Sequence, residues 1–422
     1  MIPQRSPRST RPGPRAGILL LSVSVALTAC SSDDDDAPRN LAGDPFTNDA
    51  DATAVAFVSG ATPDFETGQI ERLVIGDDIV STGVTPATGS DIRVTTDGSD
   101  IYEIGRREID TLTRFSIDEL QEPVYQYSVN GAESAANPYA VVFVSDTKAY
   151  LTRRGSPLLW IIDPSADTEA NFLLGTIDLG AYARGANPDM ADALLVDDRL
   201  YVLMERLEES FAPVQNGYVA VIDTATDIEI DTGEGLDGLP GIALLTSNPT
   251  GLQYLPESDE IYVVGRGNIF ENEAVTDDFY DGGIETIDPD TFQNELLLDD
   301  GTSDDNQDYF VDGLVVSPTK GYVLTYAAFG QTTLRTFNPM LGTLDAAPVE
   351  GLVDQDISVL ALGPQGRLWV GLNSAEAPGF RLLDTSDDSV LVERVATEFN
   401  PNAVVFLERP AAQDPGLDTG NR

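Results

Sequence analysis

The sequence predicts an all-β fold: a seven-bladed β-propeller of four-stranded antiparallel blades, with the ring closed by the C-terminal strand. Three observations lead to this prediction. Short apolar runs separated by polar turns recur with a period of roughly 50 residues, as propeller blades require. The second run of each repeat carries an aromatic residue in one register. A lone copy of the first run, residues 400–407, stands near the C-terminus with no strands of its own after it.

Each repeat opens with a predicted first strand. These strands are expected to begin near Ile92, Ala140, Ala191, Gly251, Val311, Ile357 and Ala403. The third repeat shows the whole pattern, because residues 140–144, 148–152, 158–163 and 172–179 are apolar runs divided by turn residues. Four short apolar runs separated by turn residues predict four strands and three turns.

The second and third strands carry recurring side chains. The aromatic residues of the second strands are Tyr102, Tyr150, Tyr201, Tyr262, Tyr322 and Trp369. Third strands end in Asp followed by Pro or Thr, at Asp163, Asp223, Asp288 and Asp384. Asp before Pro or Thr is typical of turns, so these carboxylates are expected to be structural.

Ring closure follows from the two ends of the repeat region. Residues 53–58, 69–75 and 79–84 predict three strands that lack a first strand, which the C-terminal run is expected to supply. Such an interlock removes exposed sheet edges. We expect the propeller to span residues 52–408 and a tail to span 409–422. Six or eight blades are the alternatives.

The repeat resembles one known family in two short sequence motifs. Residues 217–226 read GYVAVIDTAT and residues 248–251 read NPTG. In these phrases the chain resembles the YVTN-type propellers, the YncE-like group of secreted seven-bladed proteins, and the resemblance covers essentially the whole folded body. Because the shared motifs are structural, the resemblance implies architecture and export more than any activity.

The N-terminal segment predicts export and lipidation. Four arginines precede an apolar stretch at residues 16–29, which is too short to span a bilayer. Residues 27–30 read LTAC and resemble a bacterial lipobox, whose Cys30 is acylated. Ser31 then implies the outer membrane of a Gram-negative bacterium. The alternative is an ordinary signal peptide with an incidental Cys. We therefore expect a lipoprotein signal peptide at 1–29 and an acidic tether at 30–51. The sequence leaves open whether the protein lies on the periplasmic or the outer surface of that membrane.

The residue inventory restricts the chemistry. The chain has no His, and its single Cys is Cys30. This excludes disulfides, Ser-His-Asp and Cys-His catalysis, imidazole or thiolate zinc sites and covalent haem attachment. Carboxylate, Arg, Tyr and Ser/Thr side chains remain, which favours binding over turnover.

Charge restricts the partners. The formal net charge is -47, and without the first 29 residues 20 basic side chains face 71 acidic ones. Such an excess of carboxylates opposes nucleic-acid binding. Salt screens their mutual repulsion, so the composition indicates a saline, halophilic setting.

The arginines supply the main candidate site. Four of them follow second strands, and three share the spacing Tyr-x-x-x-Arg. The loops that enter the blades share that face and carry Asn before Pro. The candidate ligand-binding residues are Arg106, Arg154, Arg206, Arg266, Asn137, Asn187, Asn248 and Asn400. Guanidinium groups there would suit a carboxylate or phosphate of a small anionic ligand. The alternative is that each Arg pairs with a carboxylate of a neighbouring blade.

Two longer loops belong to the same face. Residues 207–216 and 267–281 are insertions, and long loops on a rigid scaffold are favoured places for recognition. A further acidic loop holds Asp304, Asn306 and Asp308, which are candidate Ca²⁺ ligands. It lacks the Gly and the final Glu of an EF-hand loop, so a solvated charge run is the alternative. No other cofactor is predicted.

Two classes of function remain open. The first is a noncatalytic outer-membrane lipoprotein whose propeller binds a ligand or an envelope protein at its loop-rich face. The second is a metal-dependent propeller hydrolase of lactonase type, which would need carboxylates converging on a divalent cation in the central channel. The sequence favours the first and leaves the oligomeric state open.

Overall fold

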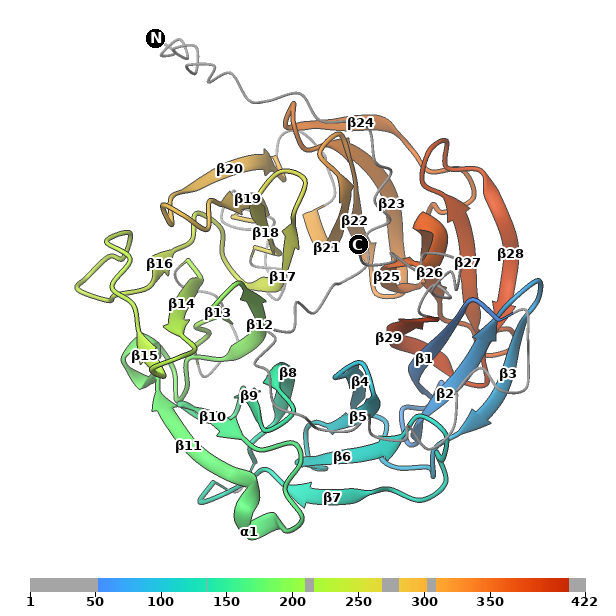
Figure 1. The fold of residues 1–422 in the computed structure, drawn as a ribbon. Coiled ribbons are helices and arrows are strands. Elements are labelled where there is room, and N and C mark those ends of the chain that lie inside the picture. The colour runs from blue at the N-terminus through green and yellow to red at the C-terminus, as the bar shows by residue number, and fades with distance from the viewer. Residues whose placement is uncertain (1–51, 134, 209–215, 268–280, 302–308, 410–422) are drawn as a thin grey trace, which may run out of the picture. The chain divides into compact units, whose positions relative to one another are not determined.

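Seven antiparallel sheets form a ring around a central channel (Figure 1). The computed structural model describes residues 52–133, 135–208, 216–267, 281–301 and 309–409. In each blade the first strand lies at the channel and the last lies at the rim. The predicted fold class and blade number are confirmed.

The strands of each blade follow one another from the channel outward. Blade 1 contains β29 (Asn400–Glu408), β1 (Ala54–Ala61), β2 (Gly68–Ile75) and β3 (Ile79–Val84). Blade 2 contains β4 (Ile92–Thr96), β5 (Asp100–Gly105), β6 (Thr111–Ser116) and β7 (Tyr125–Ser128). Blade 3 contains β8 (Pro138–Ser145), β9 (Lys148–Arg153), β10 (Leu158–Ile162) and β11 (Leu173–Asp178), with helix α1 (Glu169–Phe172) before β11.

Blade 4 contains β12 (Met190–Val196), β13 (Arg199–Met204), β14 (Tyr218–Asp223), β15 (Ile228–Glu229) and β16 (Ile242–Ala243). Blade 5 contains β17 (Pro249–Leu255), β18 (Glu260–Gly265), β19 (Gly283–Ile287) and β20 (Asn294–Asp299). Blade 6 contains β21 (Tyr309–Ser317), β22 (Lys320–Ala328), β23 (Gln331–Asn338) and β24 (Thr343–Pro348). Blade 7 contains β25 (Ile357–Gly363), β26 (Arg367–Leu372), β27 (Gly379–Asp384) and β28 (Val390–Ala396). Short 3-10 turns occur at Gly180–Tyr182 and Pro364–Gly366.

The C-terminal strand closes the ring as predicted. β29 pairs antiparallel with β1 along the whole of β1, with Phe57 opposite Val405. The two ends of the described chain therefore share one sheet, in which β29 covers the inner edge of β1. Trp369 of blade 7 packs against Phe406 of β29 with ring centroids 5.2 Å apart, so an aromatic contact supports the closure.

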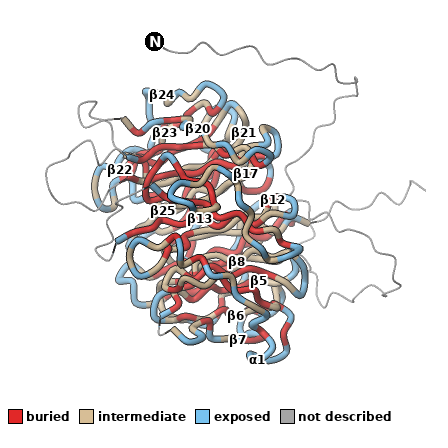
Figure 2. The backbone as a smooth tube through the Cα atoms, turned by 90° about the vertical axis from the view of Figure 1, so that its left-hand side faces the viewer, coloured by how far each residue is buried: buried red, intermediate tan, exposed pale blue. Residues whose placement is uncertain are grey.

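The apolar cores lie between neighbouring blades. Seven clusters of buried side chains each join two consecutive blades. The six aromatic residues of the second strands lie in these clusters, as their shared register predicts. Phe57 of β1 takes the corresponding place between blades 1 and 2, a role that was not predicted for it. In Figure 2 the buried segments lie within the body of the molecule, and the exposed segments include turns and the outermost strands β3, β11, β24 and β28.

Blade 4 departs from the simple four-strand pattern. β15 and β16 both pair with β14, and residues 230–241 between them leave the sheet. Two buried tyrosines hold this segment: Leu236 N–H donates to the Tyr218 hydroxyl at 2.9 Å, and Gly241 N–H donates to the Tyr182 hydroxyl at 2.7 Å. These side-chain bonds take the place of ladder bonds, which a strand pattern in the sequence does not reveal.

The second strands begin on the side of the ring that carries the turns between third and fourth strands, and we call this side the turn end. Here Lys148 Nζ donates to Asp227 Oδ1 of the next blade at 2.7 Å, and the Tyr150 hydroxyl donates to the same oxygen. Blade 6 repeats the arrangement with Lys320, Tyr322 and Asp388. The two lysines of the chain therefore form ion pairs between blades.

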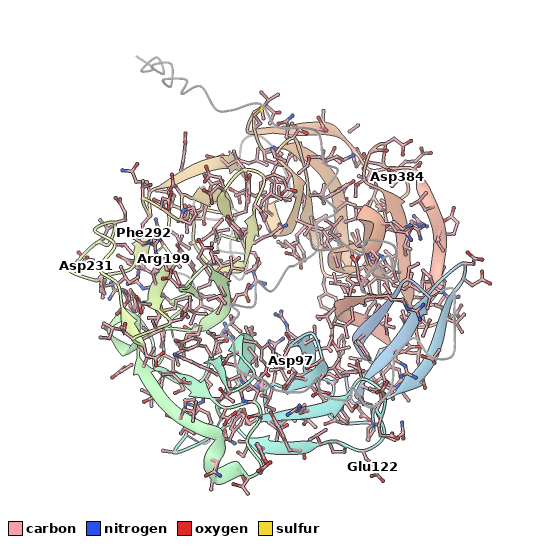
Figure 3. All side chains as sticks on the ribbon, in the orientation of Figure 1. Asp97, Glu122, Arg199, Asp231, Phe292 and Asp384 are labelled. Atoms are coloured by element: carbon pink, nitrogen blue, oxygen red, sulfur yellow. The ribbon has the colours of Figure 1, made fainter. Side chains whose placement is uncertain are left out.

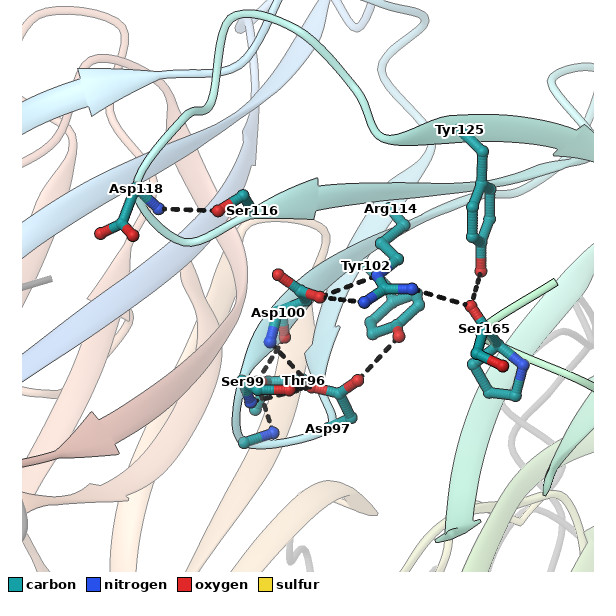
Figure 4. A network of polar contacts seen from close by, with 12 residues as sticks. Thr96, Asp97, Ser99, Asp100, Tyr102, Arg114, Ser116, Asp118, Tyr125 and Ser165 are labelled. Carbon is teal, nitrogen blue, oxygen red and sulfur yellow. Dashed lines mark hydrogen bonds and ion pairs between the residues drawn. The ribbon is translucent and has the colours of Figure 1, made fainter. Parts of the chain in front are cut away.

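Arginines complete the turn end in two other blades. Arg199 Nη1 donates to the Pro289 carbonyl at 2.6 Å, and its guanidinium lies 5.1 Å from the Phe292 ring (Figure 3). In blade 2, Arg114 pairs with Asp100 and also donates to the Pro164 carbonyl of blade 3 at 3.2 Å (Figure 4). Each of these cations therefore has a partner across a blade boundary.

The Asp residues that end the third strands are structural, as predicted. Their side chains accept backbone N–H groups of the turn that follows. Asp223 Oδ1 accepts from Thr226 at 2.8 Å, and Asp384 Oδ1 accepts from Ser386 at 2.8 Å. Such bonds fix the turn that delivers the left-handed Asp227 and Asp388 to the neighbouring blade.

Among the described residues, the structure contains no helix that is both long and apolar enough to cross a bilayer.

Candidate functional site

A cavity of ≈ 710 Å³ occupies the channel among the inner strands. Its charged lining residues are Arg93, Arg106, Asp192, Glu205, Arg266 and Asp312. A volume of this size is typical of sites for small molecules. The second strands of blades 2 to 5 end beside this cavity, on the side of the ring that we call the loop end.

Three of the four predicted arginines stand at one repeated position of the loop end. Each follows directly after a second strand, and its backbone N–H donates to a carbonyl of the loop entering the same blade. These bonds join Arg106 to Asp91 at 2.8 Å, Arg154 to Asn137 at 2.9 Å and Arg266 to Asn248 at 3.1 Å. The repeated bond fixes where each side chain leaves the backbone, so the three guanidinium groups come from equivalent places.

Tyr139 of β8 brings two of these arginines together with Arg93 of β4. The Arg106 guanidinium lies 3.8 Å from the centre of the Tyr139 ring, and those of Arg93 and Arg154 lie 5.5 Å from it. Cations at these distances are attracted by the ring's negative face. The ring therefore holds three like charges near one another in blades 2 and 3.

Glu205 is the counter-ion of this group. It is buried, Arg154 Nε donates to its Oε2 at 2.8 Å, and Arg266 Nη2 donates to its Oε1 at 3.2 Å. One carboxylate of blade 4 thus bridges arginines of blades 3 and 5. Burial acts to lower the pKa of Arg154, but the charge of Glu205, its hydrogen bond with Arg154 and the effects of Tyr139 and Asp189 together leave that pKa above its ordinary value.

Two donors of the arginine group, Arg106 Nε and Arg266 Nε, are buried without a hydrogen bond to any described residue. Besides the Tyr139 ring, Arg106 has an ion pair with Asp91 at 3.4 Å that is not a hydrogen bond, and burial lowers the pKa of its guanidinium. Since buried donors are almost always satisfied, these two N–H groups are the candidates for contact with an acceptor of a ligand.

Arg206 lies apart from the other three. It is fully buried, its Nε donates to the Tyr182 carbonyl at 2.8 Å, and its guanidinium lies 4.3 Å from the Tyr218 ring. The cause is register: Arg206 follows Tyr201 by five residues, whereas Glu205 holds the four-residue position of the other arginines. Because Arg206 stands one residue later in the chain, its side chain points into blade 4. The Tyr-x-x-x-Arg spacing had already set Arg206 apart from the other three, and the same count from Tyr201 leads to Glu205, which was not predicted.

The predicted asparagines take mainly structural positions. Asn137 and Asn248 have left-handed φ values of 48° and 51°, and Asn248 is fully buried. Asn400 Oδ1 accepts the Ser374 N–H at 2.8 Å. In blade 4 the equivalent residue is Asp189, with φ 57°, so Asn187 precedes the repeated position by two residues.

Three further carboxylates lie near the arginines, and none of them belongs to the predicted anion-binding set. Asp192 and Asp312 line the cavity, and burial raises the pKa of both. Asp192 Oδ2 accepts the Leu252 N–H at 2.9 Å, which ties β12 to β17. Burial also raises the pKa of Asp189 to about 6, against the opposing effect of Arg154. The loop end therefore carries both fixed positive and titratable negative charge.

Some predicted features fall outside the described residues. These are the candidate Ca²⁺ ligands Asp304, Asn306 and Asp308, the lipidation residue Cys30, and most of the two insertions. Within the described part of the chain, no group of three Asp or Glu residues is arranged to hold a metal ion.

Comparisons with known proteins bear on the fold. No protein-family profile and no curated sequence matches the chain. A proposed 6-phosphogluconolactonase from Bacteroides fragilis matches with 11% identity and a TM-score of 0.55, over 85% of this chain and 99% of its own. A protein of unknown function from Desulfotomaculum acetoxidans matches with 16% identity and a TM-score of 0.52, over 85% and 100%. AztD from Citrobacter koseri matches with 11% identity and a TM-score of 0.49, over 85% and 99%. At these identities the first two matches, with TM-scores above 0.5, show a shared β-propeller fold.

Proposed function

We propose that the propeller is a noncatalytic binding protein that takes a small anion at the loop end of its channel. The observation that carries the proposal is the arginine group around Tyr139, in which buried N–H donors of Arg106 and Arg266 have no partner. Planar guanidinium groups suit the oxygens of a carboxylate, sulfate or phosphate. Partial enclosure in a cavity strengthens such contacts relative to open water.

A titration tests the proposal. Sulfate and butanoate are titrated into the purified chain by calorimetry, and into Arg106→Gln and Arg394→Gln. Both variants lose one positive charge, but Arg394 is exposed on the outermost strand β28. We expect Arg106→Gln to weaken anion binding by about tenfold, the loss of roughly one charged hydrogen bond, and Arg394→Gln to leave it unchanged. Equal affinities in all three proteins, or no binding in any, would refute the anion site.

The lactonase-type alternative gains little from the described channel. Glu205 is occupied by two arginines, and Asp192 accepts backbone N–H groups with both of its oxygens. A cation site would therefore have to compete with existing contacts. Lactone hydrolysis by the purified chain that is lost on chelation and restored by a divalent ion would establish this alternative instead.

We also propose that the protein is anchored to the outer membrane of a Gram-negative bacterium through a lipid on Cys30. The lipobox-like segment and the acidic tether support this. Metabolic labelling with a clickable fatty acid should mark the wild type, and Cys30→Ala should abolish the label. Labelling that survives in Cys30→Ala would contradict the anchor.

We further propose that the protein works in a saline setting, which its excess of acidic residues supports. Because salt screens the repulsion among the carboxylates, higher salt should raise the melting temperature.

A further inference from the structure

We propose that the ligand of the channel is an amphiphilic monoanion, with its charged head at the arginines and an apolar body along the opposite wall. The inference rests on the proposed anion site and names the class of compound that the cavity accepts. It depends on an asymmetry of the cavity lining.

The charged lining residues all belong to blades 2 to 6. They are Arg93 and Arg106 of blade 2, Asp192 and Glu205 of blade 4, Arg266 of blade 5 and Asp312 of blade 6. β8 and β12, which lie among these blades, stand across the central opening from β25 and β29 (Figure 1). A ligand head held at the guanidinium groups can therefore extend its remaining atoms along the inner strands of blades 7 and 1.

The opposite wall is apolar. The inner strands of blades 7 and 1 give the cavity no charged side chain, and their apolar contributions are Ile357, Val359, Leu360, Ala361, Ala403 and Val404. All but Ile357 of these are only partly buried, so they keep apolar surface toward the channel. Ser358 and Asn402 are the polar side chains that these two strands add to the lining.

Such a wall favours an apolar ligand body. A polar body would lose hydrogen bonds to water there, because Val, Leu and Ala side chains offer no replacement. A hydrocarbon body would cover the exposed apolar surface and release water from it. The two walls together match a compound that is anionic at one end and apolar over the rest.

The cavity also limits the size of the body. A volume of ≈ 710 Å³ lies within the range that encloses small molecules. Asp312 on β21 adds a carboxylate beside the apolar wall, with burial raising its pKa. A second anionic group on the ligand body would be repelled there once Asp312 is ionised, which favours a single negative charge at the head.

A chain-length series provides the test. Butanoate, hexanoate and octanoate are titrated into the purified chain at constant pH and ionic strength. We expect each added methylene to tighten binding about twofold to fourfold, so that octanoate binds at least tenfold more tightly than butanoate. A gain below tenfold overturns the amphiphile inference. If butanoate binds and octanoate gains nothing, the anion site stands; if neither binds, the proposed function itself fails.

Two variants locate the effect. Val359→Thr and Val404→Thr keep the shape and the branching of the side chain and place a hydroxyl on the apolar wall. In the double variant we expect the gain per methylene to fall, so that octanoate loses most of its advantage over butanoate. Arg106→Gln should weaken every acid of the series by one common factor. A chain-length gain unchanged in the double variant would place the hydrocarbon elsewhere and overturn the inference.

Discussion

Basic side chains stand at both ends of the second strands, and they are paired differently at the two ends. At the turn end, Lys148 and Lys320 reach a carboxylate of the next blade at 2.7 Å, and Arg199 donates to a backbone carbonyl. At the loop end, Arg106 and Arg266 keep buried N–H donors without acceptors. Both sets of cations occupy positions in the repeated blade motif, at opposite ends of its second strand. Charge alone therefore does not identify a binding site in a propeller. Unpaired donors point to one only together with the cavity, because Arg206 and Arg381, which do not line it, also carry a buried N–H group without a partner.

Removing the shared counter-ion should give the largest effect. Glu205→Gln leaves Arg154 and Arg266 without their carboxylate, and breaking such a buried pair costs about 3 kcal/mol of unfolding free energy. The same change should tighten sulfate binding, because the anion then meets uncompensated guanidinium groups. Chemical denaturation with and without sulfate measures both. A variant that is destabilised but gains no stability from sulfate would show that Glu205 is purely structural.

The matching change at the turn end should affect stability alone. Asp388→Asn removes the charge that Lys320 and Tyr322 share but keeps a residue that tolerates the left-handed φ of 63°. We expect a loss of about 1–2 kcal/mol, the value of a charged hydrogen bond, and an unchanged sulfate affinity. Denaturation curves and calorimetry test the two halves of this expectation. A weaker sulfate affinity would mean that the two ends are coupled.

The pH should modulate the loop end through Asp189. Its pKa is raised to about 6, so the carboxyl is largely neutral below pH 6 and adds a negative charge near Arg154 above it. Sulfate affinity should therefore fall about tenfold between pH 5 and pH 7.5, the effect of one charge on a divalent anion at about 6 Å in water. Asp192 and Asp312 act in the same direction where they titrate.

The raised pKa of Asp189 also makes the stability of the fold depend on pH. A carboxyl whose pKa is higher in the folded protein than in the unfolded chain stabilises the fold at low pH and loses that contribution as the pH rises from about 4 to 6. Asp189→Asn should flatten both the binding profile and this part of the stability profile. A binding profile that keeps its slope in Asp189→Asn would assign the effect to Asp192 or Asp312.

The smallest effect is expected from the hydroxyl of Tyr139. Tyr139→Phe keeps the aromatic face that lies 3.8 Å from Arg106, so anion affinity should stay within about twofold. Tyr139→Ala removes the face, and affinity should fall several-fold because the guanidinium groups lose their support. Calorimetry on the pair separates ring from hydroxyl. Equal losses in both variants would indicate that the hydroxyl itself contacts the anion.

The sequence predicted the fold well because the propeller repeat depends on local patterns. Apolar runs, Asp turns and the aromatic register set blade number and ring closure. The site was predicted only where the register was strict: Arg106, Arg154 and Arg266 follow their tyrosines by four residues, and Arg206 does not. Arg93, Tyr139 and Asp192 lie on the inner strands of blades 2, 3 and 4, whose side chains meet only between neighbouring blades. Their proximity depends on the assembled ring, which no spacing along the chain reveals.

The central claim is that the loop end binds an anion and the turn end does not. The most direct measurement compares Arg106→Gln with Arg199→Gln, which remove one guanidinium from each end, by the shift in melting temperature that sulfate produces. We predict that sulfate stabilises Arg199→Gln as much as the wild type, although its starting stability is lower, and stabilises Arg106→Gln much less. Equal stabilisation of the two variants, or loss of the sulfate effect in Arg199→Gln alone, would contradict this claim.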